Sequence, residues 1–131
     1  MEEALIGLLL ADPTLAGQVG TRINWGRRPQ DVSTLPAVVL WRVNGLRDYN
    51  FDGPTNLINS TVQCDCYGET YASAKRAARA LMAATNGYDE TIGGVGFQRV
   101  SIESERDTQE TESNGRHLFR CSVDLSIWHD E

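Results

Sequence analysis

The chain has 131 residues, 40% of them hydrophobic and 23% charged, which is typical of one globular domain and unlike disordered segments. Its formal net charge of −6 argues against a nucleic-acid-binding surface, because such surfaces cluster Lys and Arg against phosphates. No apolar run near the start is long enough to cross a bilayer, and the acidic start (residues 1–3) is unlike a signal peptide. We therefore expect a single domain over residues 1–131, folded in a cytoplasm.

The N-terminal residues predict two helices and a short strand. Residues 2–10 place their apolar side chains on roughly one side of a helix, with acids in its first turn. Asp12 is a typical N-cap and Pro13 suits the first helical position, so a second helix is expected through about Val19. A short strand is expected over residues 22–25, and the polar segment 26–34 predicts an exposed loop.

The next two segments predict a β-hairpin. Residues 37–43 form a strand whose early part is apolar on both faces. We therefore expect a helix, another sheet or a partner subunit to cover each side. The sequence Asp52-Gly53-Pro54 has strong turn chemistry, and the strand over residues 57–67 is expected to pair back.

Three cysteines, Cys64, Cys66 and Cys121, raise the possibility of a metal or redox site. Because alternate side chains share a strand face, Cys64 and Cys66 extend an apolar row while Asp65 points to the polar side. Cys121 lies in the apolar row of the last strand. A zinc site requires four ligands, typically with C-x2-4-C spacing, and the two histidines lie four and eight residues from Cys121. The pattern favours reduced thiols that fill the core.

A third helix is expected from Tyr71 to about Asn86, with Thr70 as its N-cap and Gly87 after its end. Three basic residues should face water. The expected apolar stripe consists of Tyr71, Ala74, Ala78, Leu81 and Met82.

The C-terminal part predicts a second long hairpin, with strands over residues 97–107 and 116–128. Phe97 is out of phase with the alternation that follows it, which indicates a bulge. The connecting segment has no apolar residue and is longer than a hairpin requires, so we predict that it is a docking loop. It comprises Thr108, Gln109, Glu110, Thr111, Glu112, Ser113, Asn114 and Gly115.

These elements together predict an α+β fold: an antiparallel sheet of about four main strands, formed by two hairpins, with helices packed on one face.

The sequence contains no catalytic constellation. It has no G-x-S-x-G turn, and the glycine-rich stretch at residues 93–96 is not followed by the Lys-Ser or Lys-Thr of a phosphate-binding loop. Acid pairs such as Glu103 and Glu105 are expected at a solvated strand edge. We predict no catalytic residues, no cofactor and no metal.

Several stretches resemble the phage tail-completion family, also called tail terminators or head-tail joining proteins. They cover nearly the full length in the right order, as an overall pattern without a single diagnostic motif. They are INWGRRPQ (23–30), LPAVVLWRV (35–43), RDYNFDGP (47–54), VQCDCYGETYASAKRAARALM (62–82), GGVGFQ (93–98), ERD (105–107) and LFRCSVDLSIWHDE (118–131).

The resemblance implies a structural virion protein without enzymatic activity, made in a bacterial cytoplasm. It implies a ring, usually a hexamer, that caps the tail tube, stops its growth and joins the tail to the head connector or stopper protein. DNA would pass through the channel without specific binding, and no membrane would be involved. The same module occurs in gene-transfer particles. Two alternatives stay open: a small metal-binding protein or enzyme using Cys64, Cys66 and Cys121, and a monomeric adaptor.

Overall fold

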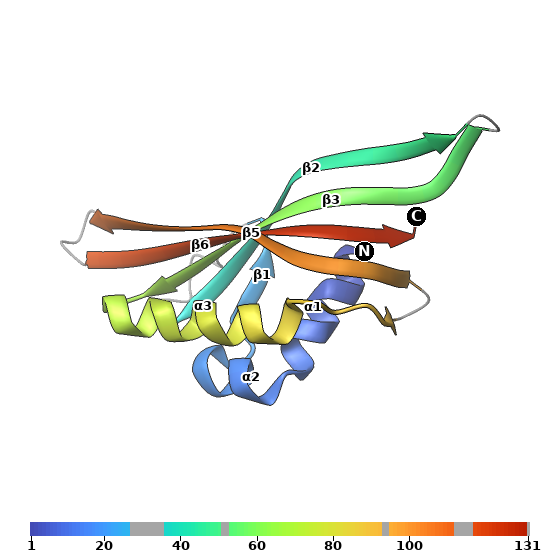
Figure 1. Cartoon of the computed structure of the whole chain (residues 1–131). Helices are drawn as coiled ribbons and strands as arrows, with labels where there is room; N and C mark the ends of the chain where they lie inside the picture. The colour runs from blue at the N-terminus through green and yellow to red at the C-terminus, as the bar shows by residue number, and fades with distance from the viewer. Residues whose placement is uncertain (27–35, 51–52, 93–94, 112–116, 131) are drawn as a thin grey trace.

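The computed structural model describes residues 1–26, 36–50, 53–92, 95–111 and 117–130, and Figure 1 shows their arrangement. A six-stranded sheet, in the order β1-β2-β3-β6-β5-β4, carries three helices on one face. The helices are α1 (Glu2–Ala11), α2 (Pro13–Val19) and α3 (Tyr71–Thr85). None of these helices is long and apolar enough to span a membrane.

The sheet is mixed. Its strands are β1 (Ile23–Trp25), β2 (Ala37–Asn50), β3 (Gly53–Gly68), β4 (Thr91–Ile92), β5 (Val95–Thr111) and β6 (His117–Asp130). The short strand β1 runs parallel to β2, and every other neighbouring pair is antiparallel. The prediction of an antiparallel sheet with about four strands was therefore wrong, because β1 and β4 add an edge strand on each side and β1 introduces a parallel pair.

The helices begin where their capping residues allow. Asp12 accepts a hydrogen bond from the Leu15 N–H at 2.8 Å, and Thr70 accepts one from the Ser73 N–H at 3.1 Å. On α3, Ala74, Ala78 and Leu81 are buried against the sheet, as predicted. Tyr71 differs from the prediction: it is 51% exposed, because it lies in the first turn of α3, at the end of the sheet.

The cysteines lie in the core. Cys64, Cys66 and Cys121 are free thiols and all three are buried. Cys66 and Cys121 are register partners on β3 and β6, which places both on the helix-covered face. Burial raises the pKa of Cys64 and Cys66 well above the ordinary range. The prediction that these cysteines fill the core is confirmed.

The early part of β2 is buried on both faces, as its sequence predicts, with Val38 at 0% and Val39 at 3% exposure. Beyond this point the hairpin β2–β3 bends away from the helices, and the hairpin β5–β6 extends in the opposite direction (Figure 1). Register shifts mark bulges in β2 between Arg42 and Asn44, and in β5 between Phe97 and Arg99, where the sequence indicated one. The sheet thus carries one projecting hairpin at each end.

Candidate interaction surfaces

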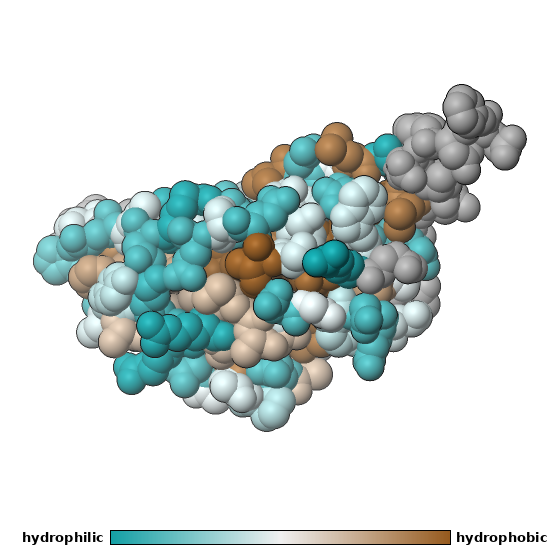
Figure 2. All heavy atoms as spheres, viewed as in Figure 1, coloured by the Kyte–Doolittle hydropathy of each residue, from teal (hydrophilic) through white to brown (hydrophobic). Residues whose placement is uncertain are grey.

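The first candidate surface is the projecting part of β2. Trp41, Val43 and Leu46 are 44%, 56% and 59% exposed, although large apolar side chains are usually buried. Figure 2 shows hydrophobic side chains along this projection, among hydrophilic neighbours. Clustered exposed apolar side chains are typical of protein–protein contacts. This surface is hereafter the β2 arm, residues 41–47.

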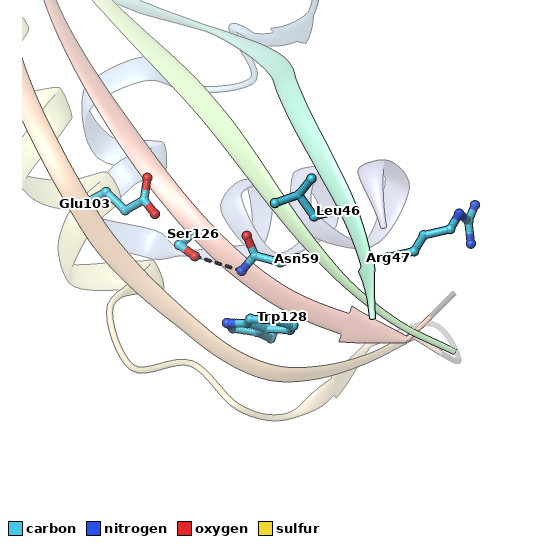
Figure 3. Close-up of a pocket in the computed structure, with 6 residues that line it drawn as sticks. All are labelled: Leu46, Arg47, Asn59, Glu103, Ser126 and Trp128. Atoms are coloured by element: carbon cyan, nitrogen blue, oxygen red, sulfur yellow. Dashed lines mark hydrogen bonds between the residues drawn. The ribbon is translucent and has the colours of Figure 1, made fainter. Parts of the chain in front are cut away.

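A shallow hollow of about 300 Å³ lies beside the β2 arm, and Figure 3 shows its lining. It is lined by Leu46, Arg47, Asn59, Glu103, Ser126 and Trp128. The Asn59 amide donates to Ser126 Oγ at 3.0 Å, which holds two of the polar groups against each other. Its open shape and mixed lining suit the rim of a protein contact better than a small-molecule site, which is usually deep and mostly apolar.

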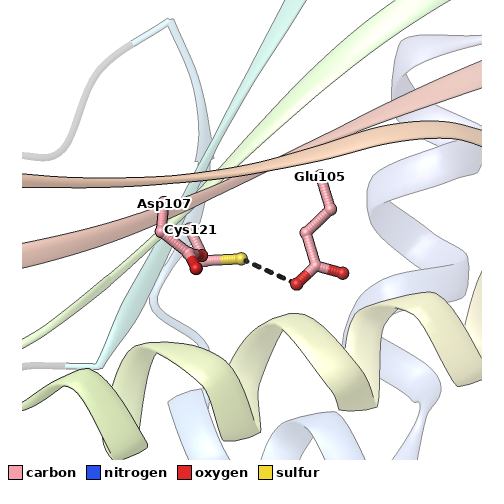
Figure 4. Close-up of side chains that lie close together, drawn as sticks. All are labelled: Glu105, Asp107 and Cys121. Carbon is pink, nitrogen blue, oxygen red and sulfur yellow. Dashed lines mark hydrogen bonds between the residues drawn. The ribbon is translucent and has the colours of Figure 1, made fainter.

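The second candidate surface is a charged cluster at the other end of the sheet. Glu105, Asp107 and Cys121 place their ligand atoms within 4.8 Å of one another (Figure 4). Lys75 from α3 lies at the same place: its ammonium is 3.0 Å from Asp107 Oδ1 and also contacts the Glu105 carboxylate. The Tyr71 hydroxyl donates to Asp107 Oδ2 at 2.9 Å. One positive charge thus faces two negative charges.

The electrostatics of this cluster favour an ion-pair network over a metal or redox centre. The hydrogen bond from Lys75 is the main reason that the pKa of Asp107 is lowered, and the pKa of Lys75 is raised by its hydrogen bond to Glu105. Burial raises the pKa of the Cys121 thiol to about 12, so it is protonated at neutral pH. A metal ion would have to displace Lys75 and deprotonate Cys121. Sequence reasoning missed this cluster because its lysine lies about 30 positions from the acids.

A Ser-His pair lies on the helix-covered face of β3 and β6. The Ser60 hydroxyl is 2.8 Å from His129 Nε2, and His129 Nδ1 is 2.7 Å from the Asp130 carbonyl oxygen. Because a carbonyl oxygen only accepts, Nδ1 carries the proton and Nε2 accepts from Ser60. Ser60 is 0% and His129 3% exposed. Burial lowers the pKa of His129, and the pair is closed to a substrate, so its arrangement is that of a satisfied core hydrogen bond.

The predicted docking loop divides into two parts. Thr108 to Thr111 form the last residues of β5 and pair with residues 117–120 of β6. Arg120 Nε donates to Thr108 Oγ1 at 3.0 Å, so this part belongs to the hairpin. The alternation of polar residues on an exposed strand looks like a loop in sequence, which explains the difference in boundary. Glu112, Ser113, Asn114 and Gly115 lie outside the described residues.

Comparison with known proteins gives a family and a fold. The family model for tail completion protein gp17 matches residues 3–130. A solved structure described as the virion of a native gene transfer agent particle contains a similar chain, with a TM-score of 0.78 and 18% identity over 100% of this chain and 95% of that one.

A second solved structure, of a protein without a functional description, has a TM-score of 0.53 and 15% identity over 97% of this chain and 96% of that one. No curated protein matches the sequence. At these identities the two structures support the fold, and the family model supports the function class. The chain belongs to the tail completion protein gp17 family and is a structural protein of a phage-type tail.

Proposed function

We propose that this protein is a tail terminator: a closed ring of identical subunits, usually six, that caps the tail tube and joins the tail to the head. The observation that carries the proposal is the family match over residues 3–130. The β2 arm supports it, because a structural protein that works by contact needs exposed apolar surface, and Trp41, Val43 and Leu46 provide it.

The proposed partners are other subunits of this chain, the tail tube protein and the head-tail connector or stopper protein. The site of action is the head-proximal end of the tail in the virion. DNA passes through the ring without specific binding, and the net charge of −6 per copy supports this, because a channel that carries DNA should not hold it by ion pairs. The similarity in fold to a chain from a gene transfer agent virion is in keeping with this location.

The alternative of a small enzyme or metal-binding protein finds little support in the described residues. Ser60 and His129 are buried, and Lys75 holds the carboxylates of Glu105 and Asp107. We propose that the protein acts without catalysis. Metal analysis of the purified protein separates this alternative from the tail terminator, since the proposed role needs no bound metal.

The experiment that tests the proposed function is electron microscopy of particles made with and without this protein. With it, tails should have a uniform length and carry heads. Without it, tails should lack heads and vary in length, and added protein should restore joining. Tails of normal length joined to heads in its absence would rule out the proposed role.

A further inference from the structure

Two long strand edges have no described neighbour along more than half of their length. On β2, hydrogen bonds from β1 end at Leu40, whose carbonyl accepts from Gly26 at 2.9 Å. On β5, hydrogen bonds with residues 87–90 end at Val100, whose N–H donates to Tyr88 at 3.0 Å. In the described part of the chain, no strand lies beside β2 after residue 40 or beside β5 after residue 100. Such edges are templates for pairing with another chain.

The register shows which residues direct their backbone N–H and C=O groups away from the sheet; these are called outward residues below. Backbone groups alternate between the two sides of a strand. Leu40 and Val100 are outward residues, so Arg42 is the next one on β2 and Ile102 is the next one on β5. Bulges shift the numbering, so the outward residues are identified by their partners on the neighbouring strand, which occur at every second position. On β2, the outward residues Arg42, Gly45 and Arg47 pair with Val62, Ser60 and Ile58 of β3. On β5, the outward residues Ile102, Glu105 and Asp107 pair with Leu125, Val123 and Cys121 of β6.

The two edges carry opposite charges on the same face of the sheet. The outward residues of the β2 arm include two arginines, and the Arg42 guanidinium lies against Gly45, where it leaves no room for a Cβ. Arg42 also forms a 3.4 Å exposed ion pair with Glu2 of α1, which places its side chain on the helix side, so Arg42, Arg47 and Glu2 together carry a net charge of one positive. The outward residues of β5 include Glu105 and Asp107, also on the helix side, with Lys75 as their shared cation. This leaves a net charge of one negative at that cluster.

The direction of the strands allows these edges to meet. β2 and β5 are antiparallel to each other, because three antiparallel pairings separate them. Copies repeated head to tail therefore bring β5 of one copy antiparallel to β2 of the next, with the helices on the same side of both. The open halves lie toward opposite ends of the sheet (Figure 1), so neighbouring copies must be staggered along the strands. Stagger inclines the strands to the axis of a closed ring.

We propose that copies of this protein assemble by pairing the open edge of β5, residues 101–109, with the β2 arm of the next copy, so that the sheet continues from subunit to subunit. This inference rests on the proposed ring. Charges and bulges on edge strands can also serve only to keep edges apart. Here the two edges carry net charges of opposite sign. Electrostatic repulsion therefore disfavours pairing of β2 with β2 or of β5 with β5, and attraction favours pairing of β2 with β5. An interface between two different surfaces of the same protein can repeat from subunit to subunit and close into a ring.

Cysteine cross-linking tests the pairing directly. Leu46 and the residues Ser104, Arg106 and Thr108 are exposed and lie on the face away from the helices. We would combine Leu46→Cys in turn with Ser104→Cys, Arg106→Cys and Thr108→Cys. The three positions lie two residues apart on the same face of β5, so the pairs test three alignments of β5 against the β2 arm. Within one copy, β3 and β6 lie between these positions, which are therefore at least about 14 Å apart, beyond the reach of a disulfide. The native thiols are buried and do not compete.

At least one double variant should give a ladder of covalent dimers, trimers and larger species on mild oxidation, while Leu46→Cys alone should give none. An intact oligomer without such a ladder, or dimers from Leu46→Cys alone, would overturn this pairing but leave the proposed ring standing. A protein that is monomeric by mass at all concentrations would overturn both.

A proline variant tests the main-chain hydrogen bonds at the same edge. The Glu105 N–H points away from β6, so Glu105→Pro removes no hydrogen bond of the β5–β6 hairpin, whereas the outward donor is lost. Glu105→Ala is the matched control, because both variants lose the contact with Lys75. At a concentration where the control is half assembled, the proline variant should assemble at least tenfold less, with a similar melting temperature. Equal assembly of the two variants would rule out strand pairing at this edge.

Discussion

The Lys75 ammonium lies 3.0 Å from Asp107 Oδ1 and also contacts the Glu105 carboxylate, so one cation from α3 serves two acids of β5. The contact joins the first turns of α3 to the hairpin β5–β6. Tyr71 reinforces it by donating to the same aspartate and by an edge-to-face contact with Phe119, with ring centroids 6.4 Å apart.

Lys75→Met should destabilise the protein by about 1 kcal/mol or less at neutral pH, because Met keeps the apolar stem and the carboxylates are partly solvated. The folded-state pKa of Asp107 is lowered, so the contribution of the pair is fully present above about pH 4 and is lost as the pH falls through that lowered pKa. Urea unfolding of both proteins at pH 7 and pH 3 measures the difference. If the difference in unfolding free energy between the wild type and Lys75→Met were larger at pH 3 than at pH 7, the ion pair with Asp107 would not be its cause.

The three thiols should react slowly in the native protein. All three are buried, and the raised pKa values keep them protonated at neutral pH. Thiol titration should label none of them quickly in the native state and three after denaturation, while Cys121→Ser should give two. Stoichiometric zinc in the purified protein, or rapid native labelling, would contradict a structural role.

Acid should destabilise the protein through His129. Its folded-state pKa is lowered by burial, so the unfolded chain binds a proton more readily. The contribution of neutral His129 is present above about pH 6.5 and decreases as the pH falls toward the folded-state pKa, by at most about 1.4 kcal/mol per pH unit. Unfolding free energies between pH 5 and pH 8 should show this decrease in the wild type. His129→Gln should show a flatter profile; identical profiles would exclude His129 as the cause.

The loop between β5 and β6 remains a proposed docking element. Thr111 and His117 are the last described pair of the hairpin, so a two-residue Asn-Gly turn in place of residues 112–116 should preserve β5 and β6. The shortened protein should fold and assemble but yield tails that fail to join heads. A Gly/Ser segment of the original length is the control, because it separates the loop's chemistry from its length. Normal particle yields from the shortened variant would show that joining uses other surfaces.

Local patterns predicted much of this structure. Alternation placed Cys64 and Cys66 in the core, and Thr70 marked the start of α3 because capping is decided within a few residues. The parallel pairing of β1 with β2 was not predictable, because three residues carry no signal of their partner. Periodicity gives faces and caps, whereas strand order depends on how the chain packs.

The candidate surfaces were harder to predict. The contacts of Lys75 with Glu105 and Asp107 arise only when α3 packs across β5, so no sequence spacing reveals them. The apolar residues Trp41 and Leu46 lie on a strand whose first half is buried, and in sequence they look like its continuation. Only the end of β1 at Trp25 and the bend of the hairpin show that they are exposed.

The proposed role of this protein is to stop tail growth and to join the tail to the head. Electron microscopy of particles that lack the protein, with tail length and head attachment measured, is the decisive test of this role. Headless tails of variable, often excessive length are expected, and the added wild-type protein should restore uniform length and heads. Tails of uniform length that carry heads without the protein would rule out the role.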